Sequence, residues 1–491
     1  MNPIHYLLYR ACVNPDAYAV FYQDKLITYG QLINGIRGGA KILRLIKSNN
    51  PSIIYMVDIR IADPLDYWIA TLSCMHEGIG TMSPGPLMAL PDSLHPRLVI
   101  QDSFQSTSEV QNHINWPTFD ELSHSTHQVT YGAIEENQIA RIFFTSGTTG
   151  NSKAIAFNFP QLAERSLIRA SYLTNYSRAL TMMPPYSSSA FQFSLMQWAL
   201  GHALALDNNV TDVVRTLSRH SVKHLIASPN QLKILIRELK SLKTALNVNA
   251  VTVLGGVMTS RLFLELRSLT RAEIFTQYGA TETGTCAVTR VLYESDLSQL
   301  GTCCPGVDAE VVDDQDDIVP PGTEGLLRIR TPHLAGGYLI SDKSPQTSLR
   351  DGWFYPGDVA VANPESGAIT LVGRVDDVAN TGGSKINLTQ IDDYLATQPG
   401  VQDAAAFCVF DNFDYPEIWA AVVVPKDFDL TRLLKTASEA LGPHHCPKRI
   451  LPVQLIPRTY SGKPQRGLMT DKVRALLGVN VRASSNHPLP Q

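Results

Sequence analysis

The sequence has no excess of charge of one sign. Its 491 residues include 41 Lys and Arg against 45 Asp and Glu, which gives a formal net charge of −4. No block of basic residues marks an arm for nucleic acid, so RNA or DNA binding is not indicated. An anionic ligand would therefore need a local binding site rather than a broad positive field.

Long apolar runs are also missing. The most apolar stretch, residues 53–75, is broken by Asp58, Arg60, Asp63 and Asp66, whereas a membrane-spanning helix needs about 18 or more consecutive apolar residues. The start, MNPIHYLLYR, lacks the charged and apolar regions of a secretory signal. We expect a cytoplasmic protein that binds neither membrane nor nucleic acid.

The seven cysteines are scattered, and none belongs to a C-x-x-C pair. This spacing argues against a disulfide framework and against a zinc cluster. The composition, 44% hydrophobic and 18% charged, is that of an ordinary globular protein. The length allows two or three domains.

Short apolar runs alternate with helical patterns through the first two-thirds of the chain. Examples of the runs are residues 179–183, 224–227 and 250–254, and residues 229–242 have helical spacing. This alternation predicts an α/β fold with layered, largely parallel sheets.

From residue 301 the pattern changes to short strands separated by Pro-Gly turns at 305–306 and 321–322. These turns predict a small β-rich subdomain over about 301–375. The rest of the chain is a compact mixture of strands and helices. We predict a large N-terminal domain, residues 1–375, and a smaller, mobile α+β C-terminal domain, residues 376–491.

A loop rich in Gly, Ser and Thr lies between two strand-like runs in RIFFTSGTTGNSKAIAF, residues 141–157. Gly147 and Gly150 let the backbone approach a polyanion closely, and Lys153 adds positive charge. Four side chains supply hydroxyl donors: Thr145, Ser146, Thr148 and Thr149. The pattern predicts a phosphate cradle, with a polar surface hairpin as the alternative. It is not the P-loop G-x-x-x-x-G-K-[ST], which requires a helix after the loop.

The run TSGTTGNSK closely resembles the signature loop of the adenylate-forming superfamily, which includes acyl-CoA synthetases, peptide-synthetase adenylation domains and luciferases. Four further motifs follow in the family's order, so the resemblance runs from Thr145 to Arg466. It implies an enzyme that uses ATP and Mg²⁺ to activate a carboxylic acid.

The second motif, QYGATET, is similar to the family's Tyr-Gly-x-Thr-Glu. The resemblance places Tyr278 beside the adenine, Thr281 at the α-phosphate and Glu282 on Mg²⁺. The chemistry is sound, because Mg²⁺ is usually bound by one or two carboxylates together with phosphate oxygens. The same nucleotide site is expected to include Gly256, Gly279 and Ala280.

The third and fourth motifs resemble the family's ribose-binding and interdomain segments. In GWFYPGD, Asp358 is placed to bind the ribose hydroxyls, and Pro356 stands where the family usually has Thr. In GRVDD, Arg374 would contact the ribose or a phosphate, and Asp376 would be the hinge between the domains.

The fifth motif, and a glycine loop that precedes it, lie in the C-terminal domain. The loop TGGSKI matches a glycine loop that lines the approach of the thiol in relatives, with Gly382, Gly383 and Lys385. The run PRTYSGKPQR resembles P-[KR]-T-x-S-G-K-x-x-R, and this match makes Lys463 the catalytic lysine. A lone lysine after glycine is usually a solvated loop residue; the order of the motifs favours the catalytic interpretation.

The implied reaction has two steps. A carboxylate attacks the α-phosphorus of ATP, with Lys463, Thr281 and Glu282 as catalytic residues, and a thiol then displaces AMP. The leading acceptor is coenzyme A, and the alternative is the phosphopantetheine arm of a carrier protein. No carrier-protein attachment site is recognised after residue 476, so we expect the acceptor to be a separate molecule. An inactive nucleotide-binding regulator is the remote alternative. Whether the protein is a monomer or a homodimer stays open.

The acyl substrate is a small carboxylic acid whose class the sequence leaves open. In PPYSSSAFQF, residues 184–193, the family's common His is replaced near Ser188, and no Asp is present to bind an α-ammonium group. An apolar pocket is expected around Ser188, Phe191 and Gly255. The alternative is that the aromatic residues of this stretch belong to the core.

Overall fold

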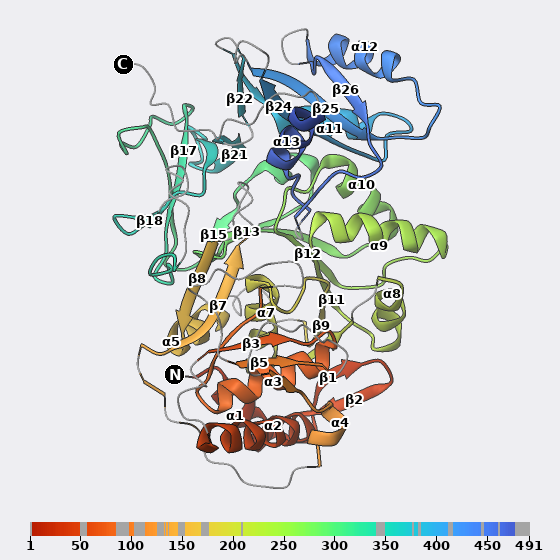
Figure 1. Cartoon of the computed structure of the whole chain (residues 1–491). Coiled ribbons are helices and arrows are strands. Elements are labelled where there is room, and N and C mark those ends of the chain that lie inside the picture. The colour runs from red at the N-terminus through yellow and green to blue at the C-terminus, as the bar shows by residue number, and fades with distance from the viewer. Residues whose placement is uncertain are drawn as a thin grey trace. The chain divides into compact units, whose positions relative to one another are not determined.

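The structure is a computed structural model that describes residues 2–49, 56–84, 98–102, 113–124, 132, 134–135, 137–145, 153–167, 176–207, 210–339, 349–375, 378–381, 384–410, 416–442, 446–459 and 462–476. The chain forms two compact units, and Figure 1 labels many of their helices and strands. Of the described residues, the first unit contains those within 1–145, 152–356 and 360–371, and the second contains those within 357–359 and 372–491.

One six-stranded sheet of the first unit has the order β6-β5-β3-β4-β7-β8. Its strands are β3 (Met56–Arg60), β4 (Gly80–Met82), β5 (Leu98–Gln101), β6 (His113–Asn115), β7 (Ile139–Thr145) and β8 (Lys153–Asn158). All neighbours are parallel except β7 and β8, which form an antiparallel hairpin. The two strand-like runs predicted around the phosphate loop are thus paired strands.

A second sheet of the first unit has the order β15-β14-β13-β12-β11-β9-β10-β1-β2. Its strands are β1 (Tyr18–Tyr22), β2 (Lys25–Thr28), β9 (Arg178–Thr181), β10 (Ala203–Leu206), β11 (His224–Ala227), β12 (Ala250–Leu254), β13 (Glu273–Ala280), β14 (Gly284–Arg290) and β15 (Thr302–Cys303). The strands from β1 through β10, β9, β11 and β12 to β13 are parallel. Every residue of β11 and β12 is buried, as expected for parallel strands covered on both faces.

The helices described in the first unit are α1 (Ile4–Val13), α2 (Tyr29–Asn49), α3 (Pro64–His76), α4 (Phe119–Leu122), α5 (Phe159–Leu167), α7 (Ser188–Ala199), α8 (Val210–Arg219), α9 (Pro229–Ser241), α10 (Ser260–Leu269) and the short 3₁₀-helix η2 (Glu294–Ser298). The predicted helix at 229–242 is confirmed as α9. It begins with a capping box in which Ser228 and Gln231 satisfy each other's backbone N–H groups, and Pro229 occupies the first turn.

A third sheet is made of short strands, as the Pro-Gly turns predicted. Its order is β18-β19-β17-β20-β21, with β16 paired to β17. The strands are β16 (Asp308–Val312), β17 (Glu324–Arg330), β18 (Leu349–Arg350), β19 (Trp353–Phe354), β20 (Asp358–Ala362) and β21 (Ile369–Arg374).

The second unit has an α+β core of its own. Its elements are β22 (Val378–Thr381), β23 (Ser384–Asn387), α11 (Leu388–Thr397), β24 (Asp403–Phe410), β25 (Pro416–Val423), α12 (Leu430–Leu441), β26 (Arg449–Pro452) and α13 (Arg466–Leu476). Strand β24 alternates between two apolar clusters: Ala404 and Ala406 face one, and Ala405 and Phe407 face the other. This period of two buries both faces of the sheet β24-β25-β26.

The predicted fold class is confirmed: a mixed α/β chain with layered sheets in a large N-terminal part and a smaller α+β C-terminal part. Among the described residues, no helix combines the length and the apolar character that crossing a membrane requires.

Candidate active site

The motif around Tyr278 forms a bent hairpin at the end of β13. The register between β13 and β14 shifts between Tyr278 and Gly279. A Cβ on Gly279 would lie 2.1 Å from the carbonyl oxygen of Gly284, and Gly284 itself has φ of +73°. Both positions therefore require glycine. The bulge places Thr281 and Glu282 in the turn that follows the strand.

Several candidate residues lie at the same edge of the large sheet. In the parallel pair β12–β13, Leu254 is opposite Gln277, so Gly255 and Gly256 follow one strand where Tyr278 continues the other. Gly255 and Gly256 are exposed, which leaves their backbone accessible. The carboxyl edge of parallel strands is where open α/β sheets bind ligands.

The first two motifs meet at Tyr338. The hydroxyl of Tyr338 donates a hydrogen bond of 2.8 Å to Oε1 of Glu282, and the ammonium of Lys153 lies 5.1 Å from the centre of the Tyr338 ring. Burial and the neighbouring Glu282 carboxylate raise the pKa of Tyr338, so its hydroxyl stays protonated and remains a donor. The backbone N–H of Leu339 donates to the carbonyl of Ala154 at 2.8 Å, which fixes this segment along β8.

The turn that carries Thr281 and Glu282 is also held from behind by Arg165 of α5. The Arg165 guanidinium donates to the carbonyl oxygens of Thr281 (2.6 Å), Glu282 (3.2 Å) and His333. Its carbon lies 4.2 Å from the centre of the Phe157 ring. Arg165 is only 1% exposed, and a buried guanidinium needs such partners to offset its lost hydration.

Sequence reasoning did not find Arg165 or Tyr338. A signal was present for Tyr338, since the run AGGYL puts an aromatic hydroxyl directly after two glycines. Gly337 has φ of +143°, a conformation that an L side chain rarely adopts. Arg165 carries no such signal, because its partners are backbone carbonyls distant in sequence.

The phosphate loop is described only at its two ends. Thr145, at the end of β7, is paired with Lys153, at the start of β8. The predicted cradle residues Ser146, Gly147, Thr148, Thr149 and Gly150 lie outside the described residues.

The predicted ribose residues lie together in the second unit. Nη1 of Arg374 is 3.2 Å from Oδ1 of Asp358, and the carboxylate is largely buried. The backbone N–H of Val375 donates to the carbonyl of Gly357 at 2.8 Å, which ties the two motifs to each other. The structure thus brings Asp358 and Arg374 into contact, while the expected hinge Asp376 lies outside the described residues.

Lys463 lies on a tight turn of the second unit. The N–H of Thr459 donates to the carbonyl of Lys463 at 2.9 Å, and the N–H of Lys463 donates to Oγ1 of Thr459 at 3.1 Å. The side chain of Lys463 is exposed. In the same unit the backbone of Lys385 pairs with that of Asn380 across the hairpin β22–β23. Gly382 and Gly383 lie outside the described residues.

The acyl-pocket candidates separate into two groups. Phe191 is fully buried, and its ring lies 5.1 Å from that of Trp68 and 5.4 Å from that of Phe143. The structure therefore makes Phe191 a core residue, in line with the alternative interpretation of the aromatics. Ser188 begins α7 and its hydroxyl accepts a hydrogen bond of 2.9 Å from Gln192. Helix α7 follows β9, and Gly255 follows β12. Because β9, β11 and β12 are parallel, Ser188 and Gly255 both come after the carboxyl edge of the same sheet.

The residues fit a magnesium ion that is shared with a nucleotide, but not a metal held by protein alone. No group of three or more His, Cys, Asp or Glu side chains could hold a metal among the described residues. Glu282 offers one carboxylate, of which Oε1 accepts from Tyr338 and Oε2 has no hydrogen bond from a described residue. One carboxylate completed by phosphate oxygens and water is a common arrangement for Mg²⁺.

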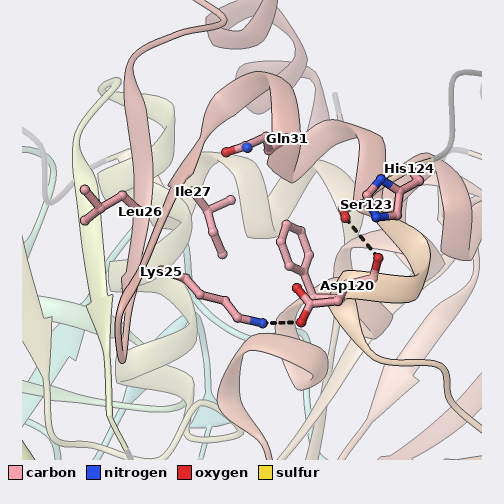
Figure 2. Close-up of a pocket in the computed structure, with 8 residues that line it drawn as sticks. Lys25, Leu26, Ile27, Gln31, Asp120, Ser123 and His124 are labelled. Atoms are coloured by element: carbon pink, nitrogen blue, oxygen red, sulfur yellow. Dashed lines mark hydrogen bonds and ion pairs between the residues drawn. The ribbon is translucent and has the colours of Figure 1, made fainter.

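A surface hollow of about 370 Å³ lies between β2, the start of α2 and α4 (Figure 2). Two of its charged side chains pair with each other, since Nζ of Lys25 is 2.5 Å from Oδ2 of Asp120. It is lined by Lys25, Leu26, Ile27, Gln31, Phe119, Asp120, Ser123 and His124. None of these residues belongs to the motifs, so the hollow is not part of the candidate active site.

Comparisons with known proteins agree with the motifs. The family model "AMP-binding enzyme" matches residues 88–339, and "AMP-binding enzyme C-terminal domain" matches residues 390–463. The chain therefore belongs to the family of AMP-binding enzymes, and it is an AMP-forming ligase.

Among individual relatives, the chain is 26% identical over 457 residues to human acyl-coenzyme A synthetase ACSM2A, mitochondrial, covering 83% of this chain and 78% of the relative. Its fold is similar to that of O-succinylbenzoate coenzyme A synthetase (MenE) from Bacillus subtilis in complex with AMP, with a TM-score of 0.82, 21% identity and coverage of 95% and 98%. ATP-bound MatB from Rhodopseudomonas palustris has a TM-score of 0.81, 19% identity and coverage of 97% and 100%. MenE has also been solved with ATP and a magnesium ion.

Proposed function

We propose that this ligase uses ATP to convert a small carboxylic acid into an acyl-adenylate and then transfers the acyl group to the thiol of coenzyme A. One observation carries the proposal: Tyr338 contacts both motifs, since its hydroxyl donates to the carboxylate of Glu282 and the ammonium of Lys153 lies 5.1 Å from the centre of its ring. An anionic oxygen for a metal and a cation for phosphates, both in contact with one side chain, suit metal-bound polyphosphate.

In the first step the acid's carboxylate oxygen bonds to the α-phosphorus, and the bond to pyrophosphate breaks. No general base is needed, because a carboxylic acid is already ionised at neutral pH. Mg²⁺ held by Glu282 would neutralise charge on the phosphate oxygens. Thr281 donates to the α-phosphate, and Lys153 with the loop residues Ser146–Gly150 binds the departing pyrophosphate.

Other residues bind the nucleoside and add a further positive charge at the α-phosphate. Tyr278 contacts the adenine, with the backbone of Gly256, Gly279 and Ala280 around it. The paired Asp358 and Arg374 bind the ribose, and the ion pair of 3.2 Å between them orients the carboxylate for two hydroxyl groups. Lys463 brings a positive charge to the α-phosphate and the substrate carboxylate.

In the second step the thiol sulfur bonds to the acyl carbon, AMP leaves and the thiol proton is released. We propose that the C-terminal domain, residues 376–491, turns about Asp376 between the steps. This motion would withdraw Lys463 and bring the loop of Gly382, Gly383 and Lys385 to the thiol, as hinge motions at a domain-terminal residue do.

Coenzyme A is preferred as the acceptor because the relative ACSM2A is an acyl-coenzyme A synthetase and MenE is a coenzyme A synthetase. A separate carrier protein presents the same phosphopantetheine thiol and is the second candidate. The acyl group is proposed to bind beyond the sheet edge, near Ser188 and Gly255, and Phe191 supports that region from the core. A cytoplasmic location stays a prediction of the sequence.

ATP–pyrophosphate exchange with a panel of aliphatic, aromatic and dicarboxylic acids tests the first half-reaction. The expected result is exchange that depends on one class of acid and on Mg²⁺, and that is lost in Glu282→Gln. The acid found in this way is then supplied with coenzyme A or a phosphopantetheinylated carrier protein, and the thioester is measured. Absence of exchange with every acid, while ATP still binds, would favour the inactive regulator and overturn the proposal.

A further inference from the structure

The side chain of Glu282 is held by a hydrogen bond that uses only one of its oxygens. Glu282 is 7% exposed, and Oε1 accepts the Tyr338 hydroxyl at 2.8 Å. A buried carboxylate can rotate about its last torsion and present either oxygen unless a partner fixes it. The Tyr338 hydroxyl supplies that partner and leaves Oε2 for a second ligand.

The backbone behind this side chain is fixed separately. Arg165 donates to the carbonyls of Thr281 and Glu282, and also to that of His333 in the segment that leads to Tyr338. The N–H of Ala335 donates to the carbonyl of Glu282 at 2.8 Å. One buried cation therefore joins the turn that carries the carboxylate to the segment that carries its hydroxyl partner.

We propose that Tyr338 and Arg165 are positioning residues for Glu282: Arg165 fixes the backbone of the turn, and the Tyr338 hydroxyl points the second carboxylate oxygen at the metal of the metal–ATP complex. This inference rests on the proposed role of Glu282. Hydrogen bonds to a ligating carboxylate commonly decide its orientation and its affinity for metal. Because Lys153 lies over the same ring, Tyr338 also fixes the spacing between the metal ligand and the cation of the phosphate loop.

The first test is Tyr338→Phe, which removes the hydroxyl and keeps the ring under Lys153. The affinity for ATP is measured by calorimetry over a series of Mg²⁺ concentrations and in the presence of EDTA. We expect the Mg²⁺ concentration that gives half-maximal ATP binding to rise roughly 10-fold, the lower end of the range for such partners. Binding of ATP in EDTA and the melting temperature without ligand should stay close to those of the wild type.

Tyr22→Phe is the matched control. The Tyr22 hydroxyl also donates to a carboxylate of the first unit, at 2.5 Å from Oδ2 of Asp63, but neither residue belongs to a motif. This variant should leave the Mg²⁺ dependence unchanged. A Tyr338→Phe protein with the wild-type Mg²⁺ dependence would overturn the inference.

Arg165 is tested by rescue, with Arg165→Met and Arg165→Lys compared. Lysine keeps the charge but cannot reach three carbonyl groups in a fixed plane, so we expect Arg165→Lys to need more Mg²⁺ than the wild type and less than Arg165→Met. Arg267→Lys is the control, because Arg267 donates to the carbonyls of Ala272 and Val291 and stacks on an aromatic ring outside the site. Equal effects of Arg165→Lys and Arg267→Lys on the Mg²⁺ dependence would contradict the role of Arg165.

Glu282→Gln separates failure of this inference from failure of the proposed function. If Glu282→Gln binds ATP with the wild-type Mg²⁺ dependence, the metal role of Glu282 itself is wrong. If Glu282→Gln loses that dependence while Tyr338→Phe and Arg165→Lys keep it, Glu282 binds the metal without these partners and only the inference fails. The Tyr338→Phe result stands by itself if the Arg165 variants do not fold.

Discussion

Arg458 and Asp403 form a two-pronged ion pair at the base of the turn that carries Lys463. Nε of Arg458 is 3.0 Å from Oδ2 of Asp403, and Nη2 is 2.7 Å from Oδ1. The same guanidinium donates through Nη1 to the carbonyl of Gly462 at 2.7 Å. Arg458 therefore connects strand β24 directly to the residue that precedes Lys463.

Asp403→Asn should reduce the rate of adenylation by loosening this turn. Loss of the charge weakens both prongs of the pair, and a small displacement of a reacting group can lower the rate by roughly 10- to 100-fold. The expected loss is in kcat of the exchange reaction, with KM for ATP little changed. Asp308→Asn, which breaks an exposed pair with Arg330, should leave kcat unchanged; the same loss in both variants would contradict the prediction.

Lys463→Ala should damage the first half-reaction much more than the second. The ammonium faces charge that develops on the α-phosphate, so its removal should slow adenylation on the order of 10²–10³-fold or more. In the proposed thiol-transfer state the lysine has turned away with its domain. The variant should therefore make thioester from synthetic acyl-adenylate at nearly the normal rate. Equal losses in the two half-reactions would mean that Lys463 does not leave the site.

Asp376→Pro should produce the opposite imbalance. Proline restricts φ at the proposed hinge and so limits the change of backbone conformation that the domain motion needs. Adenylation, measured by pyrophosphate exchange, should be largely retained, while thioester formation from acyl-adenylate should be blocked. Unimpaired thioester formation would place the hinge elsewhere.

Asp358→Ala should raise KM for ATP modestly and leave kcat nearly unchanged. The carboxylate is proposed to bind the ribose equally in the ground state and the transition state, and loss of such uniform binding appears in KM. The control is Asp358→Glu, which keeps the charge and a partner for Arg374 and should fall between the wild type and Asp358→Ala. An unchanged KM for ATP in Asp358→Ala would remove this residue from the site.

His224→Gln should make stability less sensitive to acid. Burial lowers the pKa of His224 from its ordinary value of 6.5 to about 3, so the folded protein keeps this ring neutral while the unfolded chain takes up a proton below pH 6.5. The neutral His224 ring therefore does not lower the free energy of unfolding above pH 6.5. As the pH falls from 6.5 towards 3, that free energy decreases by at most roughly 1.4 kcal/mol per pH unit.

The measurement is the free energy of unfolding by denaturant at pH 7, 6 and 5. The slope against pH should be shallower in His224→Gln, whose amide can still hydrogen-bond Thr252, the partner of His224 at 2.8 Å. His113→Gln, at an exposed position, is the control and should keep the wild-type slope. Identical slopes for wild type and His224→Gln would show that His224 does not titrate differently in the two states.

The sequence by itself determined the features that depend on neighbouring residues. The buried strands β11 and β12 and the capped helix α9 lie where the apolar runs and the helical spacing predict them. The glycines of the Tyr278 motif are needed for the local backbone of the bent hairpin, so a short signature was enough to locate the turn that carries Glu282. The other motifs are also short runs of neighbouring residues, so their order along the sequence was sufficient to identify the family.

Only the tertiary structure decided which residues surround those motifs. Arg165 is 117 positions from Glu282, and Tyr338 is 56 positions from it; no periodicity or spacing encodes such contacts. Helix α7 is a second example, because its polar Gln192 and Ser194 are as buried as Phe191, so its pattern could not separate core from pocket. Local signatures constrain the backbone within a few residues, whereas burial and partnership depend on how distant segments pack.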